Sequence, residues 1–156
     1  MLDRLVLVVL LILLAWGGVV LWRRYQRWHL DALNRLPGPD CLADLSLRPV
    51  PAILYFTTAT CSQCRLRQTP ILRQLEAEWG DAVHICTVDA VAYEALARHF
   101  GILTVPSTVV LDARRRVVAI NHGLAEASRL RQQIGSTGRW TIDDGRWRTR
   151  TVTSNQ

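Results

Sequence analysis

Lysine is absent from this 156-residue chain, and all nineteen basic residues are arginine. The absence excludes lysine Schiff-base enzymes and P-loop nucleotide-binding enzymes, because both need a lysine amine. Only four cysteines are present, too few for a disulfide-stapled miniprotein of this length. The length excludes two full enzyme domains. With 49% hydrophobic and 21% charged residues, the chain is neither disordered nor fibrous, and it can build a packed core.

The net charge of +6 is unevenly distributed along the chain. Residues 1–29 hold four arginines and one aspartate, whereas residues 30–156 hold fifteen arginines and twelve acidic residues. Half of the excess therefore lies on the first fifth of the chain, and we expect no nucleic-acid partner.

A long uncharged run near the N-terminus predicts a membrane anchor. Leu5–Trp22 is eighteen residues without a charge, and as a helix it would span about 27 Å, the thickness of a bilayer core. The alternative is a cleaved signal peptide, which has an apolar region of about 7 to 15 residues, a positive leader and a small-residue cleavage site. Here the leader is only Asp3-Arg4, and the run ends at Trp22-Arg23-Arg24-Tyr25. This ending favours a retained single-pass anchor.

Arginine counts on either side of the run favour one orientation. Three arginines follow it, whereas Arg4 is offset by Asp3 on the other side. The positive-inside rule then places the rest of the chain in the cytoplasm, with an extracytoplasmic domain as the alternative.

The periodicity divides the chain into an anchor with a juxtamembrane helix (1–36), a domain (37–134) and a tail (135–156). Within the domain the apolar patterns predict the order β-α-β-α-β-β-α, an α/β fold with a mixed sheet. The expected strands are 51–58, 82–88, 108–111 and 116–120, and the expected helices are 62–79, 93–100 and 126–134. Arg114–Arg116 falls on the predicted hairpin turn, where solvated side chains are expected. The tail fits either a terminal hairpin around Asp143-Asp144-Gly145 or a frayed basic end.

The motif Cys61-Ser62-Gln63-Cys64 lies where the first strand ends and the long helix begins. At a helix start, unpaired backbone N–H groups and the helix dipole stabilise a thiolate and lower the pKa of the first thiol. Cys61 is then the attacking nucleophile. The second sulfur lies one turn further along, where it can attack a mixed disulfide and release the partner. Cys64 is then the resolving thiol.

A zinc site is the main alternative for this motif, because half of a zinc site has the same spacing. It needs two further ligands, but no second closely spaced pair is present. An inert pair of core cysteines is a third interpretation. Cys86 falls in a strand and is expected to be a small buried residue, while Cys41 lies near the start of the domain. The candidate additional zinc ligands are Cys41, His84, Cys86, His99 and His122.

Four further features accompany the cysteine motif: the segment from Ala52 to Cys64, an aspartate at position 89, the segment Phe100–Thr108 and Gly123. Together they resemble the thioredoxin-like family over about 95 of the 156 residues. The resemblance implies that Pro106 is cis, and that Val105 and Pro106 form a ledge where substrate pairs in an extended conformation. It also places Thr60, directly before the first cysteine, at the substrate-binding surface.

The sequence departs from the family pattern at the residues that tune the chemistry. Thr60 replaces the usual tryptophan, and Ser62-Gln63 replaces glycine-proline. The buried aspartate that assists the resolving thiol corresponds to Tyr55, and its lysine partner corresponds to Ile85. The helix proline, commonly five residues after the second cysteine, is six after it, at Pro70. The usual acid-base relay is therefore missing.

These features predict a thioredoxin-like fold preceded by one transmembrane helix, and a membrane-tethered thiol-disulfide oxidoreductase, with reduction favoured. The expected partners are protein disulfides or dithiols and an upstream electron donor, without a metal or organic cofactor. The alternatives are a non-catalytic binding module with the same fold and a zinc-bridged module.

Overall fold

The computed structural model describes residues 2–35, 45, 47–137, 140–143 and 146–149, with side chains left out at 2–9, 26, 27, 29, 35, 140–143 and 146–149. Two compact units divide the chain at residue 36: Met1–Leu36 and Pro37–Gln156. Cys41 lies outside the described residues.

The first unit is one helix, α1 (Leu2–Arg35). It joins the predicted anchor and the predicted juxtamembrane helix without a break. Within the described residues, no helix combines the length and the apolarity that crossing a membrane requires. The transmembrane part of the predicted fold class is therefore not supported. Residues 5–9 of the predicted span have side chains outside the described part.

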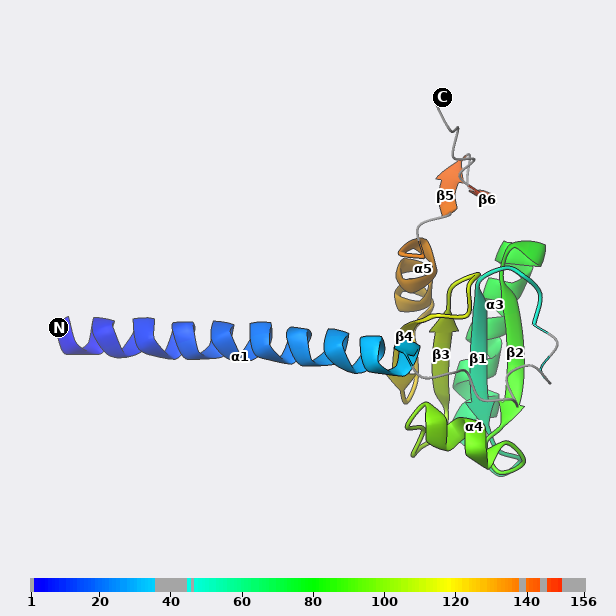
Figure 1. The fold of residues 1–156 in the computed structure, drawn as a ribbon, viewed down its shortest axis with the longest axis horizontal. Helices are drawn as coiled ribbons and strands as arrows, with labels where there is room; N and C mark the ends of the chain where they lie inside the picture. The colour runs from blue at the N-terminus through cyan, green and yellow to red at the C-terminus, as the bar shows by residue number, and fades with distance from the viewer. Residues whose placement is uncertain (1, 36–44, 46, 138–139, 144–145, 150–156) are drawn as a thin grey trace. The chain divides into compact units, whose positions relative to one another are not determined.

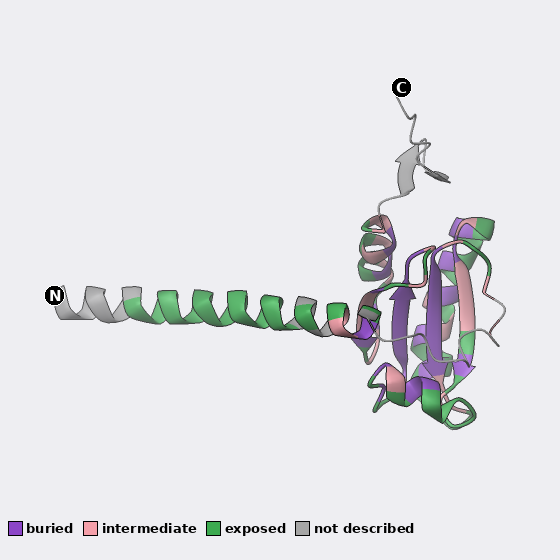
Figure 2. Ribbon diagram, viewed as in Figure 1, coloured by how far each residue is buried: buried purple, intermediate pink, exposed green. Residues whose placement is uncertain are grey.

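The second unit is built on a four-stranded mixed sheet with the order β2-β1-β3-β4 (Figure 1). The strands are β1 (Ala52–Thr57), β2 (His84–Asp89), β3 (Ser107–Leu111) and β4 (Val117–His122). β1 pairs in parallel with β2 and antiparallel with β3, and β3 pairs antiparallel with β4. Figure 2 shows the two central strands, β1 and β3, buried along their length. The predicted mixed α/β sheet is confirmed.

Successive side chains of a strand point to opposite faces of the sheet. The first five side chains of β1 are all buried, so both faces of the sheet are covered by helices. Ile53 and Tyr55 share one buried cluster with residues of α3 (Thr69–Trp79) and α5 (Ala127–Gly135). Phe56 contacts Phe100, which follows α4 (Glu94–His99), with ring centroids 6.3 Å apart. A short 3-10 turn, η2 (Gly80–Ala82), connects α3 to β2. β1 ends at Thr57, and three residues separate it from the cysteine motif.

The helix after the cysteine motif opens with a π-helical turn, η1 (Cys64–Gln68). The N–H group of Thr69 donates to the carbonyl oxygen of Cys64, five residues earlier. A π-turn holds one residue more than an α-turn, which matches the extra residue before Pro70. The continuous 62–79 helix predicted from the sequence is therefore π-helical over one turn, and Pro70 lies in the first turn of α3, where its missing N–H is tolerated.

The tail forms a hairpin rather than a frayed end. β5 (Trp140–Asp143) pairs antiparallel with β6 (Arg146–Thr149). The predicted turn residues Asp144 and Gly145 lie outside the described residues.

The β3–β4 turn anchors the chain before β1, which the sequence did not indicate. Asp112 accepts hydrogen bonds from the backbone N–H groups of Arg114 and Arg116 at 2.8 and 2.9 Å. Arg115, in the left-handed region at φ 65°, donates to the carbonyl oxygen of Leu47 at 2.7 Å and to that of Arg48. The expectation of a solvated arginine run is wrong for Arg115, because its guanidinium satisfies backbone carbonyls.

His84 makes the stability of this region depend on pH. Its Nδ1 accepts a hydrogen bond from the Arg48 N–H at 3.3 Å, which requires the unprotonated nitrogen. Partial burial and the positive charges of Arg48 and Arg115 lower the pKa of His84, against a smaller raising effect of Glu76. Since the folded pKa lies below the unfolded value of about 6.5, this stabilisation is fully present above that pH. It is lost as the pH falls from there through the lower pKa of the folded state.

Lowering the pH from 7.5 to 5.5 is expected to decrease the urea midpoint of unfolding of the wild-type chain. The decrease should be smaller in His84→Gln, because glutamine does not titrate. Equal pH dependence of the two proteins would contradict this assignment.

Candidate active site

A disulfide joins Cys61 and Cys64 at the start of the helix, with sulfur atoms 2.06 Å apart and Cα atoms 5.3 Å apart. Cys61 is half-buried, whereas Cys64 is only 1% exposed. One sulfur is therefore accessible to a partner, and the other is covered by the helix.

The backbone around Cys61 directs a dipole at its sulfur. The N–H group of Cys64 donates to Cys61 Sγ at 3.1 Å, the contact that an N-cap side chain makes with the third residue of a helix. The N–H group of Cys61 itself donates to the carbonyl oxygen of Thr58 at 3.1 Å. In the reduced protein, the amide and the helix dipole favour the thiolate of Cys61.

The peptide bond between Val105 and Pro106 is cis, as the family resemblance implied. Pro106 is buried and Val105 is half-buried. Val105 and Cys61 both pack against the buried cluster that contains Cys64. Two segments that are far apart in the sequence thus meet the same part of the core.

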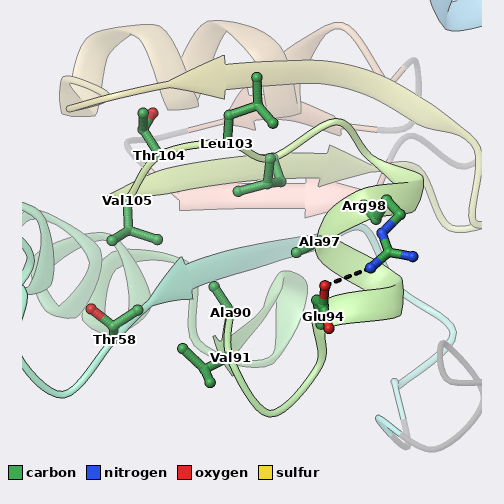
Figure 3. Close-up of a pocket in the computed structure, with 10 residues that line it drawn as sticks. Thr58, Ala90, Val91, Glu94, Ala97, Arg98, Leu103, Thr104 and Val105 are labelled. Atoms are coloured by element: carbon green, nitrogen blue, oxygen red, sulfur yellow. Dashed lines mark hydrogen bonds and ion pairs between the residues drawn. The ribbon is translucent and has the colours of Figure 1, made fainter.

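A groove of about 350 Å³ is lined by Val105, and we call it the Val105 groove. Figure 3 shows Thr58 and Val105 at one end of it and the ion pair of Glu94 with Arg98 at the other. Leu103 also lines the groove and is 92% exposed. Thr60, which the sequence also suggested for substrate binding, is exposed beside Cys61 but does not line this groove.

Gln68 is a buried polar residue that the sequence analysis missed. Its side chain is 0% exposed, donates through Nε2 to the carbonyl oxygen of Ala125 at 3.1 Å, and accepts from the Ala125 N–H at 2.8 Å. It ties the π-turn that begins at Cys64 to the loop before α5. A glutamine in a helical pattern normally suggests an exposed position, so the sequence carried no signal for this role.

Tyr55 lies on the same face of the sheet as the cysteine pair and is 3% exposed. Its hydroxyl lies 3.3 Å from Thr69 Oγ1. The structure thus places a phenol where the family commonly has a carboxylate.

The remaining cysteines and histidines do not assemble a second site within the described part of the chain. Cys86 is free and half-buried on β2, and burial raises the pKa of its thiol. Among described residues, no group of three histidine, cysteine or acidic side chains is placed to hold a metal ion.

A sequence model of the family described as "TraF: F plasmid transfer operon protein" matches residues 42–135. The chain belongs to the TraF family. The matched region includes the whole four-stranded sheet, the cysteine pair and the cis proline.

Known relatives of this TraF-family chain include thioredoxins. Thioredoxin 2 of Plasmodium berghei is 26% identical over 116 residues, covering 71% of this chain and 73% of its own length. A thioredoxin-like protein of Synechocystis is 28% identical over 86 residues, covering 55% and 80%.

Solved structures show the same fold. Thioredoxin-2 of a malaria parasite has a TM-score of 0.51 at 23% identity and covers 56% of this chain and 82% of its own. A mutant thioredoxin from Halobacterium salinarum has a TM-score of 0.54 at 22% identity and covers 65% and 87%. The domain is therefore thioredoxin-like, and its fold, relatives and disulfide-bonded C-x-x-C pair support a thiol-disulfide redox function.

Proposed function

We propose that this chain is a thiol-disulfide oxidoreductase that reduces disulfide bonds of client proteins with the Cys61–Cys64 dithiol. The observation that carries the proposal is the contact of the Cys64 amide with Cys61 Sγ at 3.1 Å at a helix start. It favours a thiolate on the accessible sulfur, and a thiolate is the species that attacks disulfides.

The reaction proceeds in two exchanges. The Cys61 thiolate attacks one sulfur of the client disulfide, forms a mixed disulfide with it, and displaces the other client sulfur as a thiolate. The Cys64 thiol then loses its proton and attacks Cys61 Sγ. The internal disulfide forms, and the client leaves fully reduced. The client gains two electrons and the dithiol loses two, so an upstream reductant must regenerate Cys61 and Cys64.

Val105 and Pro106 are proposed to position the client backbone, with Thr60 contacting it on the other side of Cys61. The Val105 groove carries an apolar side chain, Leu103, that is 92% exposed. An exposed leucine in a groove that also contains Val105 suits an apolar side chain of the client.

Leu103→Ser is expected to raise the KM for a client that carries an apolar residue near its disulfide by at least about tenfold, because burying an apolar side chain contributes about 1.5–3 kcal/mol. The rate at saturating client should change little. Leu66→Ser is the matched control, since Leu66 is 74% exposed on η1 and does not line the groove. If both variants, or neither, raise the KM, the client does not use this groove.

The direct test of the proposed function is a redox titration of the Cys61–Cys64 couple against glutathione, together with insulin reduction in the presence of dithiothreitol. A reductase is expected to have a low potential and to accelerate insulin reduction. A strongly oxidising couple would reverse the proposed direction. A Cys61 thiol that alkylates with iodoacetamide as slowly as an unperturbed cysteine would indicate a binding module.

Membrane attachment through α1, with the domain facing the cytoplasm, is also a proposal. It rests on the uncharged run Leu5–Trp22 and on the arginines that follow it. Described apolar side chains along α1 are exposed, including Trp16 at 69% and Leu21 at 69%. Carbonate extraction tests the attachment, and protease protection of a reporter after Gln156 tests the sidedness. A chain released by carbonate would exclude an integral anchor.

A further inference from the structure

Cys64 presents a chemical problem that the proposed function leaves open. Its thiol must lose a proton before it can attack Cys61, yet the residue is only 1% exposed. Burial without a partner disfavours the thiolate. The position of the usual carboxylate holds Tyr55, and that of its lysine partner holds Ile85.

A second groove, of about 580 Å³, lies between the helix and strands β1 and β2. We call it the Tyr55 groove. Its lining includes Tyr55 from β1, Thr87 from β2 and Thr69 from the first position of α3. Thr58 and Ala59, which precede the cysteine motif, also line it, as does Arg65, which follows it. Residues on both sides of the cysteine pair in the sequence therefore line the groove.

The π-turn joins the backbone of Thr69 to that of Cys64. The Thr69 N–H donates to the Cys64 carbonyl oxygen, and Thr69 Oγ1 lies 3.3 Å from the Tyr55 hydroxyl. Tyr55 and Cys64 also share one packed cluster. Two side chains that carry hydroxyl groups therefore meet in the lining of a groove large enough for water, and each hydroxyl can both donate and accept.

Resting on the proposed function, we propose that the hydroxyl pair of Tyr55 and Thr69 positions the water that receives the proton of Cys64. The proton leaves the thiol for this water and passes into the Tyr55 groove, and the resulting thiolate attacks Cys61 Sγ. The electron pair of the broken sulfur-sulfur bond leaves with the client sulfur. Tyr55 and Thr69 are positioning residues, because they act on the thiol through water.

The charged groups facing this path come from three elements. Arg65 lines the groove from η1, Arg73 and Glu76 line it from α3, and Asp89 lines it from the end of β2. Asp89 Oδ1 already accepts from the Val91 N–H at 2.8 Å. The arginines favour a thiolate near the groove and the carboxylates disfavour it. The groove carries two charges of each sign, so the opposite effects of these charges on the thiolate offset one another. The hydroxyl pair is therefore the feature to which we assign the proton transfer.

The test is stopped-flow reaction of the reduced full-length chain with 5,5′-dithiobis(2-nitrobenzoate) from pH 5 to 9. Every protein compared carries Cys41→Ser and Cys86→Ser, so that only the Cys61–Cys64 pair can react. The first coloured thiolate then reports attack by Cys61, and the second reports attack by Cys64. In Tyr55→Phe and Thr69→Val we expect the second phase to slow about tenfold and its pH midpoint to rise. The first phase should stay within about twofold of wild type. Thr69→Ser should restore the second phase.

Thr87→Val is the matched control. Thr87 lies opposite Tyr55 in the β1–β2 register, and its substitution removes a hydroxyl from the same groove while the hydroxyls of Tyr55 and Thr69 stay in place. It should leave both phases unchanged. The proposal is overturned if the second phase keeps its wild-type pH profile in Tyr55→Phe and Thr69→Val, if both phases slow equally, or if Thr87→Val has the same effect. If the chain with Tyr55 and Thr69 intact and only Cys41 and Cys86 replaced releases no coloured thiolate, the proposed function itself is refuted.

Discussion

Cys61→Ser is expected to reduce thiol-disulfide exchange to background, at least about a thousandfold below wild type. A serine hydroxyl does not form the anionic nucleophile that attacks disulfides near neutral pH, and removing the attacking group eliminates the pathway. Two measurements check this: the rate of insulin reduction with dithiothreitol, and the rate of the reaction of the reduced variant with 5,5′-dithiobis(2-nitrobenzoate). Cys64→Ser should still attack, but it should accumulate the mixed disulfide, visible as a covalent adduct on a non-reducing gel.

Cys86→Ser is the control for this prediction. Cys86 is free and half-buried on β2, with the pKa of its thiol raised by burial, so its loss should leave the exchange rate unchanged. Retention of exchange by Cys61→Ser would mean that another thiol is the nucleophile, and the proposed roles of both residues of the motif would fail.

Gln68→Leu is expected to have the largest effect on stability among the variants considered. It keeps the approximate size of the side chain but leaves the N–H and the carbonyl oxygen of Ala125 buried without their partner. An unsatisfied buried polar group costs about 1–3 kcal/mol, so we expect the free energy of unfolding to fall by about 2–4 kcal/mol. For a domain of this size, this corresponds to a decrease in Tm of roughly 10–20 °C.

Thermal unfolding of the full-length chain measures this loss. Gln74→Leu, at an exposed position of α3, is the control and should change the stability by less than about 0.5 kcal/mol. If Gln68→Leu were as stable as wild type, the two hydrogen bonds to Ala125 would contribute nothing net, and the role of Gln68 in holding the π-turn would be wrong.

The helices and strands of the domain could be predicted from the periodicity of apolar residues and from the glycines that end the helices. The apolar run 51–58 corresponds to β1, Gly80 ends α3 with φ 53°, and Gly101 follows α4 with φ 65°. These features are local: alternation marks a strand, a 3.6-residue spacing marks a helix, and glycine tolerates positive φ. The cysteine spacing at a strand-helix junction likewise pointed to the reactive pair.

The polar contacts within the fold did not follow in the same way. The roles of Gln68 and Arg115 depend on partners 57 and 68 residues away, Ala125 and Leu47. A buried glutamine looks in sequence like an exposed one, and an arginine in a turn looks solvated. The hydrogen bond from the Thr69 N–H to the Cys64 carbonyl oxygen exists because the helix contains a π-turn.

The sequence by itself determined the order of the elements, the strand-to-helix position of Cys61 and Cys64, and, through the family resemblance, the cis bond before Pro106. Those are properties of neighbouring residues and of short motifs. Only the tertiary structure decided how deeply Cys64 is buried, which hydroxyls meet in the Tyr55 groove, and which loop holds the active-site helix. Those depend on how the chain packs, and packing joins residues whose separation in sequence carries no periodic signal.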